Sequence, residues 1–289
     1  MSPVQVTGEV LAVKPAGSYY ALTVVAKGIA GQVQPGQFVG IAVGGENTSM
    51  LLRRCFSVHQ ASERGVYGGT VEVVFAVTGR GTAWLARRRQ GDSLDIVGPL
   101  GKPFALPKDA ANCLLVGGGY GSAPLFGLAE RLRERGCRVD FVLGAATAEK
   151  LFGALEAKRR GASVAFTTDD GSLGDRGVVS DVLPEVIERT RADVIYACGP
   201  MGMLAAVHRV AGSAYGGQGI PAFVAVEESM ACGVGVCMTC VLPVVGRDGL
   251  TRMVRTCVDG PVFASASIRW DSLDGVPADA VGAGTMGAS

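Results

Sequence analysis

Short runs in which apolar and polar residues alternate fill roughly the first hundred residues and predict an antiparallel β structure. Turn signals such as Pro35-Gly36 separate the runs, and their number favours a closed barrel, predicted here for residues 1–104. One short helix is expected among the strands, at 81–89. The predicted strands span 5–14, 19–26, 37–43, 55–60, 70–77 and 93–97.

The pattern changes after Pro107, where continuous apolar runs begin to alternate with helical segments. This alternation predicts an open parallel sheet of the nucleotide-binding type over residues 105–226. Ligands bind beyond the carboxyl ends of such strands, which makes the loops 117–124, 168–177 and 198–201 candidate sites. The predicted strands are 112–116, 138–144, 163–168, 193–198 and 222–226, and the predicted helices are 125–135, 147–160 and 177–190.

A small C-terminal module is expected at 227–270, because two short apolar runs flank the turn Gly246-Arg247-Asp248-Gly249. The runs 241–245 and 250–254 therefore predict a hairpin. Beyond Trp270 the chain consists mainly of Asp, Gly, Ala and Ser with few large apolar groups. Residues 271–289 are accordingly expected to form a disordered tail.

Four cysteines in this module have metal-ligand spacing. Cys232, Cys237 and Cys240 are separated by four and then two residues, and Cys257 follows after sixteen more. A CxxxxCxxC run with a distant fourth Cys is the plant-type [2Fe-2S] pattern, and the glycines between the first two thiols allow backbone N–H groups to approach cluster sulfurs. Zinc remains an alternative, although only Cys237 and Cys240 form a zinc-type knuckle. Two disulfides are the third possibility.

Composition narrows the class of protein further. The chain has 27 Lys and Arg against 26 Asp and Glu, so its net charge of +1 gives no reason to expect nucleic acid as a partner. The sequence contains no long apolar stretch that would predict a membrane span. Eight cysteines without a secretory signal indicate a reducing, cytoplasmic environment.

Two segments of the predicted barrel carry groups suited to a flat ring and a diphosphate. Strand alternation places Arg54 and Phe56 on one face and Cys55 and Ser57 on the other. The Gly79–Thr82 turn opens the short helix, where free N–H groups can meet phosphate. Each motif alone is common in surface turns, and the glycine loop GGGxGxAP at 117–124 is not the ordinary GxGxxG fingerprint.

The chain combines a barrel, a nucleotide-type domain and a cysteine module, in that order. This combination resembles the electron-transfer subunits of two-subunit, NAD-dependent dihydroorotate dehydrogenases, within the ferredoxin reductase superfamily. The resemblance covers residues 4 to about 270, and the combination of motifs is far more specific than any one of them. It is carried by Leu51-Leu52-Arg53-Arg54-Cys55-Phe56-Ser57-Val58, Gly79-x-Gly81-Thr82, Gly117-Gly118-Gly119-x-Gly121-x-Ala123-Pro124, Thr168-Asp169-Asp170-Gly171-Ser172, Cys198-Gly199-Pro200-Met201, Met230-Ala231-Cys232-Gly233-x-Gly235-x-Cys237-x-x-Cys240 and Cys257-x-Asp259-Gly260-Pro261-Val262-Phe263.

The resemblance implies three cofactor sites. FAD would contact Arg54, Cys55, Phe56, Ser57, Val74, Phe75, Gly81 and Thr82 in a flavin-binding barrel. NAD would contact Gly117, Gly118, Gly119, Gly121, Asp169, Asp170, Gly171, Cys198, Gly199, Pro200 and Met201. The cluster would be held by Cys232, Cys237, Cys240 and Cys257.

Two positions depart from the family pattern. Cys55 stands where relatives usually have proline, and Ala76 stands where they have a basic residue that Arg80 could replace. Cys198 is also compatible with a core position, and the two histidines, His59 and His208, are expected to be packing or surface residues.

The function implied by the resemblance is a relay from the cluster through FAD to NAD. No (β/α)₈ barrel with an FMN site is visible, so dihydroorotate chemistry would belong to an FMN-containing catalytic subunit, in a heterotetramer with two copies of each chain. The alternatives are a related reductase that serves a ferredoxin, a polysulfide or a hydrogenase-type partner, and a zinc module that only docks a partner. The choice between NAD and NADP is expected to depend on side chains around 144–149.

Overall fold

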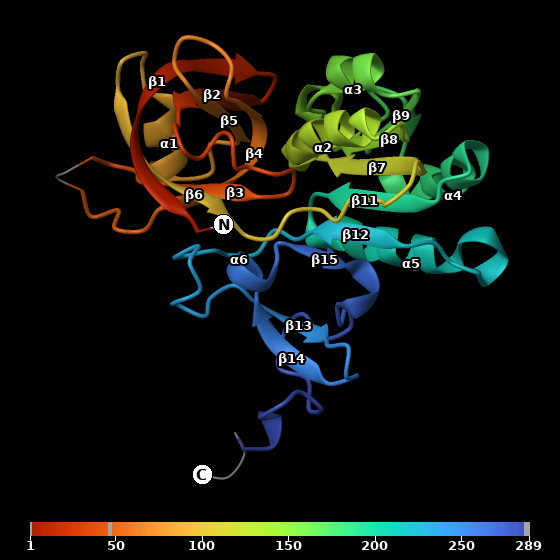
Figure 1. Cartoon of the computed structure of the whole chain (residues 1–289). Helices are drawn as coiled ribbons and strands as arrows, with labels where there is room; N and C mark the ends of the chain where they lie inside the picture. The colour runs from red at the N-terminus through yellow and green to blue at the C-terminus, as the bar shows by residue number, and fades with distance from the viewer. Residues whose placement is uncertain (1, 46–47, 286–289) are drawn as a thin grey trace.

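The computed structural model describes residues 2–45 and 48–285. Its N-terminal part is a closed six-stranded antiparallel barrel with the strand order β1-β2-β5-β4-β3-β6 (Figure 1). A bulge between Val10 and Ala12 lets the long first strand pair with both β2 and β6, which closes the barrel. The elements are β1 (Val4–Ala16), β2 (Tyr19–Val25), β3 (Phe38–Ile41), β4 (Arg54–Ser62), β5 (Thr70–Phe75), α1 (Arg80–Ala86) and β6 (Ser93–Leu100).

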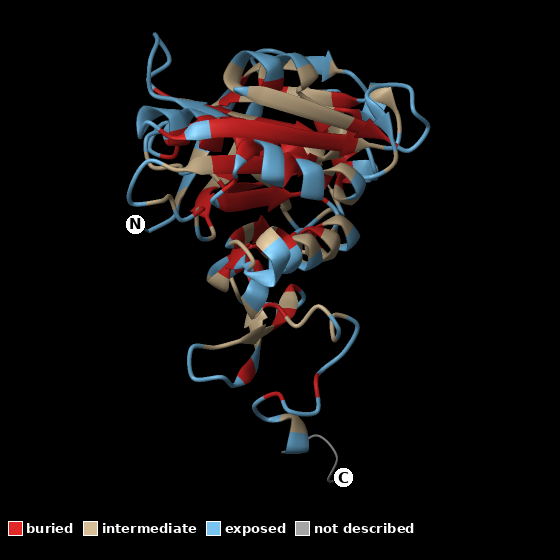
Figure 2. Ribbon diagram, turned by 90° about the vertical axis from the view of Figure 1, so that its right-hand side faces the viewer, coloured by how far each residue is buried: buried red, intermediate tan, exposed pale blue. Residues whose placement is uncertain are grey.

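The second part is a seven-stranded sheet in the order β10-β9-β8-β7-β11-β12-β15. Its central strands β7 (Asn112–Gly118) and β11 (Val194–Cys198) are buried almost throughout, as parallel strands covered on both faces must be (Figure 2). The other strands are β8 (Arg138–Ala145), β9 (Ser163–Thr168), β10 (Asp175–Arg176), β12 (Ala222–Ala225) and β15 (Val262–Ala264).

Helices cover both faces of this sheet and create two apolar cores. Helices α2 (Ala123–Glu134) and α3 (Ala154–Arg160) close one core, and α4 (Val179–Thr190) and α5 (Met201–Gly217) close the other. Single 3₁₀ turns lie at Gly119–Ser122 and Ala148–Lys150. Because the strands β7, β8, β9, β11 and β12 run parallel, the loops that follow them meet at one edge of the sheet.

The sheet and its helices differ from the predicted set at three points. An additional strand, β15, pairs antiparallel with β12 at the edge, beyond the predicted strand 222–226. The predicted helix 147–160 is interrupted before α3 by Gly153, whose φ is +77° and whose missing Cβ leaves room for the Phe126 ring. Helix α5 was not predicted, and its C-terminal end leaves helical geometry at Ala214–Gly216.

The C-terminal module lies below both larger parts in Figure 1. Strands β13 (Val241–Val245) and β14 (Thr251–Arg255) form the predicted hairpin, and α6 (Thr256–Asp259) follows directly. The hairpin brings Cys257 back beside Cys240, and both thiols are buried. Two further 3₁₀ turns occur at Ser265–Ser267 and Ala283–Thr285.

The segment after Trp270 differs from the expected disordered tail as far as the structure describes it. The amide of Val281 donates to the carbonyl of Thr251 over 2.9 Å, and Arg269 pairs with Asp279 over 2.8 Å. Ala280 is buried against the hairpin. Hydrogen bonds and an ion pair therefore hold a segment that has too few apolar groups to pack by itself. Residues 286–289 lie outside the described residues.

No helix in the described ranges is both long and apolar enough to span a membrane.

Hydrogen bonds from the turn between β1 and β2 tie the barrel to the nucleotide-type domain. The hydroxyl of Tyr19 donates to the carbonyl of Lys150 over 2.7 Å, and the hydroxyl of Ser18 donates to the carbonyl of Glu149 over 3.0 Å. The Tyr19 ring also contacts Tyr120 and Phe152. These hydrogen bonds and ring contacts join the two parts at this junction.

The variant Tyr19→Phe is expected to lose about 1–2 kcal/mol of unfolding free energy, because it leaves the Lys150 carbonyl without its hydroxyl donor. Tyr20→Phe is the matched control, since the neighbouring ring stacks on Phe75 and its hydroxyl donates no hydrogen bond within the described residues. Guanidinium unfolding of both variants measures the difference. Equal losses in the two variants would contradict the assigned role of the Tyr19 hydroxyl.

Candidate cofactor and electron-transfer site

The loop that follows β12 brings the four cysteines with metal-ligand spacing into one region. Cys240 and Cys257 are buried against Phe38 and Leu100 of the barrel, Cys232 is half-buried, and Cys237 is exposed. One side of the group therefore faces the barrel and the other faces solvent. All eight cysteines of the chain are free thiols, which removes the disulfide alternative in this structure.

The thiols are arranged as two contacting pairs. Cys232 and Cys237 contact each other, as do Cys240 and Cys257. Among the described residues no three His, Cys, Asp or Glu side chains are grouped as they would be around a single metal ion. A zinc site needs four ligands around one ion, whereas a two-iron cluster takes two thiolates at each iron. The pairs therefore fit a [2Fe-2S] cluster better than zinc.

Backbone N–H groups in the loop stabilise negative charge on sulfur. The amides of Val234 and Val236 donate to Cys232 Sγ over 3.4 and 3.3 Å. Burial raises the pKa of the Cys232 thiol, but these N–H groups and that of Cys237 outweigh it and bring the pKa to about 6. The opposite holds at Cys257, where burial and the neighbouring Cys240 raise the pKa to about 12. A bound cation would compensate this cost.

The shape of the cysteine loop also suits a [2Fe-2S] cluster. Gly233 and Gly235 have φ values of +72° and +82°, and a Cβ on Gly235 would lie 2.5 Å from Val258 Cγ2. Arg255 holds the loop by donating to the carbonyl of Gly235 over 2.7 Å. The hydroxyl of Thr256, next to Cys257, is buried and has no partner among the described residues. These features describe a tight cradle with an unused polar group beside the thiols.

A fifth thiol, Cys55, touches the loop from the barrel side. Its Sγ lies 3.9 Å from the carbonyl oxygen of Met230, and a Cβ on Gly233 would be 2.9 Å from that sulfur. Burial, followed by the charges of Cys232 and Cys240, raises the pKa of Cys55 to about 12. Cys55 is thus a neutral thiol that packs against the cluster loop.

A cavity of about 530 Å³, which we term the barrel-side cavity, separates the barrel from this loop. All four residues of the strand segment Arg54–Ser57 line the cavity. Gly81 does not line it; its missing Cβ instead makes room for the Arg54 side chain, whose Nε would lie 2.9 Å away. Of the residues predicted to contact FAD, the cavity is lined by Arg54, Cys55, Phe56, Ser57, Val74, Phe75 and Thr82.

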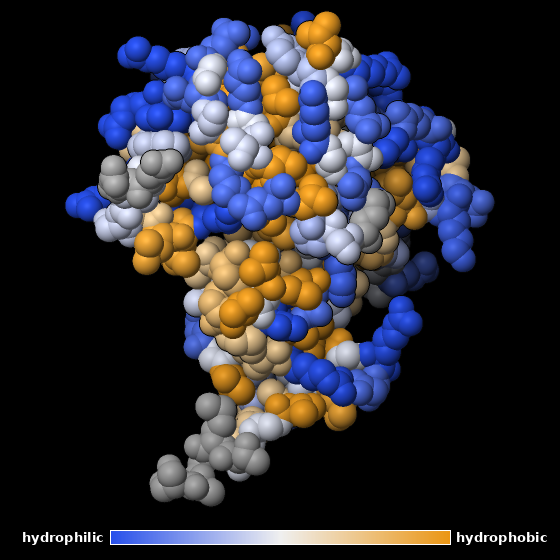
Figure 3. Space-filling view, turned by 60° about the vertical axis from the view of Figure 1, so that its left-hand side comes forward, coloured by the Kyte–Doolittle hydropathy of each residue, from blue (hydrophilic) through white to orange (hydrophobic). Residues whose placement is uncertain are grey.

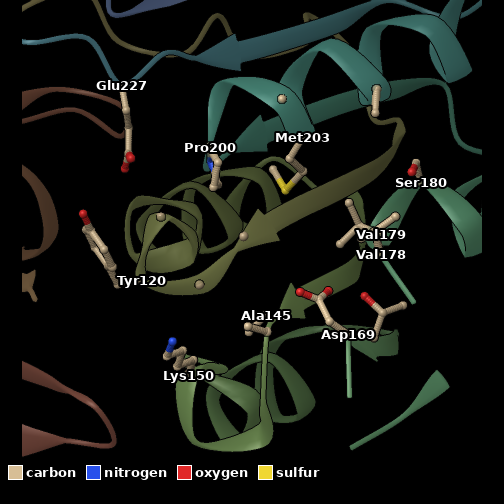
Figure 4. Close-up of a pocket in the computed structure, with 18 of the residues that line it drawn as sticks. Tyr120, Ala145, Lys150, Asp169, Val178, Val179, Ser180, Pro200, Met203 and Glu227 are labelled. Atoms are coloured by element: carbon tan, nitrogen blue, oxygen red, sulfur yellow. The ribbon is translucent and has the colours of Figure 1, made fainter. Parts of the chain in front are cut away.

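A second cavity of about 500 Å³, the sheet-side cavity, lies over the carboxyl ends of the parallel strands (Figure 4). It is bordered by the turn after β7, the start of α4 and the start of α5. Of the residues predicted to contact NAD, the cavity is lined by Gly118, Gly119, Gly121, Asp169 and Pro200. The predicted residues that do not line it are Gly117, Asp170, Gly171, Cys198, Gly199 and Met201.

Local hydrogen bonding and burial explain these differences. The carboxylate of Asp170 accepts hydrogen bonds from the amide and hydroxyl of Ser172 over 3.0 and 2.6 Å, which holds it within its own turn and lowers its pKa. Cys198 is fully buried in β11, and burial followed by the charge of Glu227 raises its pKa well above the usual value. Cys198 therefore has the character of a core residue.

The two cavities share one wall. Tyr120, Gly121 and Glu227 line both of them. Desolvation raises the pKa of the Glu227 carboxyl, and burial, followed by the charge of Glu227, raises the pKa of Tyr120. A ligand in either cavity therefore meets the same polar side chains at this boundary.

Several lining residues had no sequence signal. Lys150, Met203 and Glu227 enter the sheet-side cavity from three separate elements, and only tertiary folding brings them together (Figure 4). Ala76, a departure from the family pattern, lines the barrel-side cavity. Neither histidine reaches the two cavities: His59 Nδ1 lies 2.8 Å from the carbonyl of Ala123, and His208 stacks on Trp270.

Comparison with known families matches two parts of the chain. The model for the iron-sulfur cluster binding domain of dihydroorotate dehydrogenase B matches residues 227–269, and the oxidoreductase NAD-binding domain matches residues 115–209. The chain is 40% identical over 253 residues to the dihydroorotate dehydrogenase B (NAD(+)) electron transfer subunit of Geobacillus thermodenitrificans, covering 86% of this chain and 92% of that protein. It is 34% identical over 256 residues to the subunit of the same name from Enterococcus faecalis, covering 86% and 92%.

Solved structures agree on the fold. A chain from the structure of an NADH-dependent reduced ferredoxin-NADP oxidoreductase superposes with a TM-score of 0.77 at 31% identity, over 91% of this chain and 90% of that one. A ferredoxin NADP⁺ reductase from Neisseria gonorrhoeae has a TM-score of 0.58 at 17% identity over 71% of this chain and 89% of that one, and shows the fold alone.

Replacing Cys257 by Ala is expected to abolish iron binding, whereas Cys55→Ala should retain about two irons per chain. Both thiols belong to the same small apolar cluster, so the pair separates ligation from packing. Iron and acid-labile sulfide analysis, with the visible spectrum, measures the result. Loss of iron in Cys55→Ala, or its retention in Cys257→Ala, would contradict the assignment of ligands.

Proposed function

Since the chain belongs to the family of electron transfer subunits of dihydroorotate dehydrogenase B, we propose that it conducts electrons from a dihydroorotate-oxidising partner subunit to NAD⁺ in pyrimidine biosynthesis. The observation that carries the proposal is that neighbouring sites share residues. Phe38, Cys55 and Met230 belong both to the barrel-side cavity and to the apolar cluster of Cys240 and Cys257, and Tyr120, Gly121 and Glu227 line both cavities. Cluster, FAD and NAD are the proposed occupants of the thiol group, the barrel-side cavity and the sheet-side cavity, respectively.

When bound, the cluster would exchange single electrons and the flavin would convert them to the hydride that nicotinamide requires. The chain supplies position and electrostatics for this chemistry. In the barrel-side cavity, the Arg54 guanidinium is the cationic group for a diphosphate, and Val74 and Phe75 are apolar lining residues for a flat ring. The hydroxyl of Thr82 bonds within its own turn, to the carbonyl of Gly79, and helps to shape the wall.

The sheet-side cavity is suited to a dinucleotide. The glycines 118, 119 and 121 allow close approach of the ligand to the backbone after β7, and Lys150 offers one positive charge. At the shared wall, Tyr120 and Glu227 lie where the nicotinamide would face the flavin. These side chains would orient the two rings and restrict water between them.

The exposed side of the cluster module is the proposed docking surface for the partner subunit. Figure 3 shows apolar atoms gathered below the barrel, and the exposed apolar side chains of the cluster module include Val234, Val236, Met238 and Val258. Cys237 is exposed in the same loop. A partner on this face would both bury the apolar side chains and approach the cluster. We propose that this partner contains FMN and that two copies of each chain assemble.

We also propose a cytoplasmic location, which the presence of eight free thiols supports.

A related reductase that serves a ferredoxin is the second candidate. The superposition on the NADH-dependent reduced ferredoxin-NADP oxidoreductase chain, with a TM-score of 0.77, favours it. The two candidates share the internal relay and differ only in the protein that docks at the cluster.

The decisive experiment combines this chain with a dihydroorotate-oxidising flavoprotein from the same organism. Co-purification and dihydroorotate-dependent NAD⁺ reduction that requires both chains are expected. Activity without this chain, or no association between the two, would exclude the role of subunit. A parallel assay with a reduced ferredoxin tests the second candidate.

Within the complex, Cys232→Ser should abolish electron transfer between the partner and this chain while NADH still reduces the bound FAD. The reason is that Cys232 is a predicted cluster ligand and lines neither of the two cavities. Stopped-flow flavin absorbance after mixing with NADH reports the second reaction separately. Equal loss of both reactions would refute the order of the relay.

Introducing charge on the proposed docking surface by Val236→Glu is expected to weaken partner association at least about tenfold, because it places a carboxylate in an apolar interface. Val66→Glu is the matched control, since Val66 is 94% exposed on the barrel and Val236 is 79% exposed in the cluster loop. Analytical ultracentrifugation of each variant with the partner measures association. A similar effect of both substitutions would place the interface elsewhere.

A further inference from the structure

We propose that Arg255 raises the reduction potential of the cluster by fixing the orientation of one peptide group, the one that joins Gly235 to Val236. Arg255 ends β14, two residues before Cys257, and its guanidinium contacts the loop that begins at Cys232. The inference rests on the proposed function, because it gives a positioning role toward the cluster to a side chain that is not a ligand.

Consecutive backbone amides of the loop donate hydrogen bonds to thiols. The N–H of Gly235 donates to the Cys257 thiol, and the N–H of Val236 donates to Cys232 Sγ over 3.3 Å. The amide of Cys237 bonds to the same sulfur as that of Val236. Hydrogen bonds to ligand sulfurs favour the reduced cluster, since reduction adds one negative charge to the iron and its ligands. The orientation of these peptide groups therefore affects the reduction potential.

Arg255 holds one of these peptide groups from its other end. The carbonyl of Gly235 and the N–H of Val236 belong to a single planar trans peptide group, so they point in opposite directions. Arg255 Nη1 donates to this carbonyl over 2.7 Å, while the N–H donates to Cys232. Rotation of the peptide group would turn the carbonyl oxygen toward the sulfur, and it would also break the hydrogen bond from Arg255.

The residue at 235 makes such a rotation sterically accessible. The φ of Gly235 is +82°, and a Cβ there would lie 2.5 Å from Val258 Cγ2, so a residue with a side chain does not fit. Glycine adopts several backbone conformations at little steric cost. The loop thus needs a glycine at this position, and the hydrogen bond from Arg255 restricts the conformations that this glycine would otherwise allow.

No carboxylate within the described residues forms an ion pair with the Arg255 guanidinium. Asp259 accepts only from the backbone N–H of Arg255, over 3.2 Å, and its own ion pair is with Lys102. Arg252, on the same strand, differs because it pairs with Asp248 over 2.7 Å. A cationic donor polarises the peptide group more strongly than a neutral one, which strengthens the hydrogen bond at the opposite end.

The test measures the midpoint potential of the cluster in the loaded protein by a redox titration monitored with EPR. Arg255→Met keeps an unbranched apolar stem but removes the donor and the charge. It should lower the equilibrium constant for one-electron reduction about tenfold, which corresponds to about 59 mV. Arg255→Lys keeps a cation that can donate and should recover most of this loss.

Arg252→Met is the matched control on the same strand. The exposed ion pair with Asp248 contributes little, so this variant should keep the equilibrium constant within about twofold of the wild-type value. A similar loss in Arg252→Met and Arg255→Met would overturn the inference, as would a wild-type potential in Arg255→Met.

A second measurement reports on the peptide group itself. After exchange into D₂O, pulsed EPR of the reduced cluster detects deuterons on the amides beside the sulfurs. Arg255→Met should lose the coupling of one such deuteron, whereas Arg255→Lys should retain it. A lower potential with unchanged couplings would overturn the inference, because the charge of Arg255 would then act without the peptide group.

Arg255→Gln is a second variant without the bond, because its side chain is too short to reach the Gly235 carbonyl. It should show the same loss and decides the test where Arg255→Met binds fewer than two irons. Loss of the cluster from both variants would overturn the inference, since Arg255 would then serve assembly. Wild-type protein without a two-iron cluster would instead refute the proposed function of the loop.

Discussion

The close approach of two glycines determines where the cavities can lie. A Cβ on Gly121 would stand 2.8 Å from the Cα of Gly199, so the turns after β7 and β11 pass closer than any side chain would allow. This contact holds the turn at Gly119–Ser122 against the carboxyl edge of the sheet, and the two cavities lie beside the turn. Tyr120 and Gly121 can then border both cavities, and the distance between their proposed occupants stays short.

The fold was largely predictable because its signals are local. Apolar and polar residues alternate in the barrel strands because only one face of each strand is buried. The apolar runs in β7 and β11 are unbroken because both faces of these strands are buried. Helix α5 was missed because it is rich in glycine, including Gly202 and Gly212, and its stability comes from packing against the sheet. Strand β15 has three residues, too few to show any periodicity.

The candidate site was predictable only where the spacing of residues along the sequence determines how close their side chains lie. The cysteine spacing sufficed because the ligands lie within one loop and one hairpin, whose turn could be recognised. The nucleotide cavity is different, since Lys150, Asp169 and Glu227 reach it from separate loops. The motif resemblance predicted NAD contacts for both Asp169 and Asp170. In the structure only Asp169 lines the cavity, whereas Asp170 accepts hydrogen bonds from Ser172.

The cysteines become more buried from the proposed docking surface toward the barrel-side cavity. This order of burial matches the order of the proposed relay. Cys237 is exposed, Cys232 is half-buried, and Cys240 and Cys257 lie against the barrel. Cys55 then contacts the loop with its sulfur and also lines the barrel-side cavity, so one side chain spans the boundary between the two. A proline at this position would offer neither the thiol nor a backbone donor. The thiol therefore provides a contact between the cluster loop and the barrel-side cavity, where FAD is the proposed occupant.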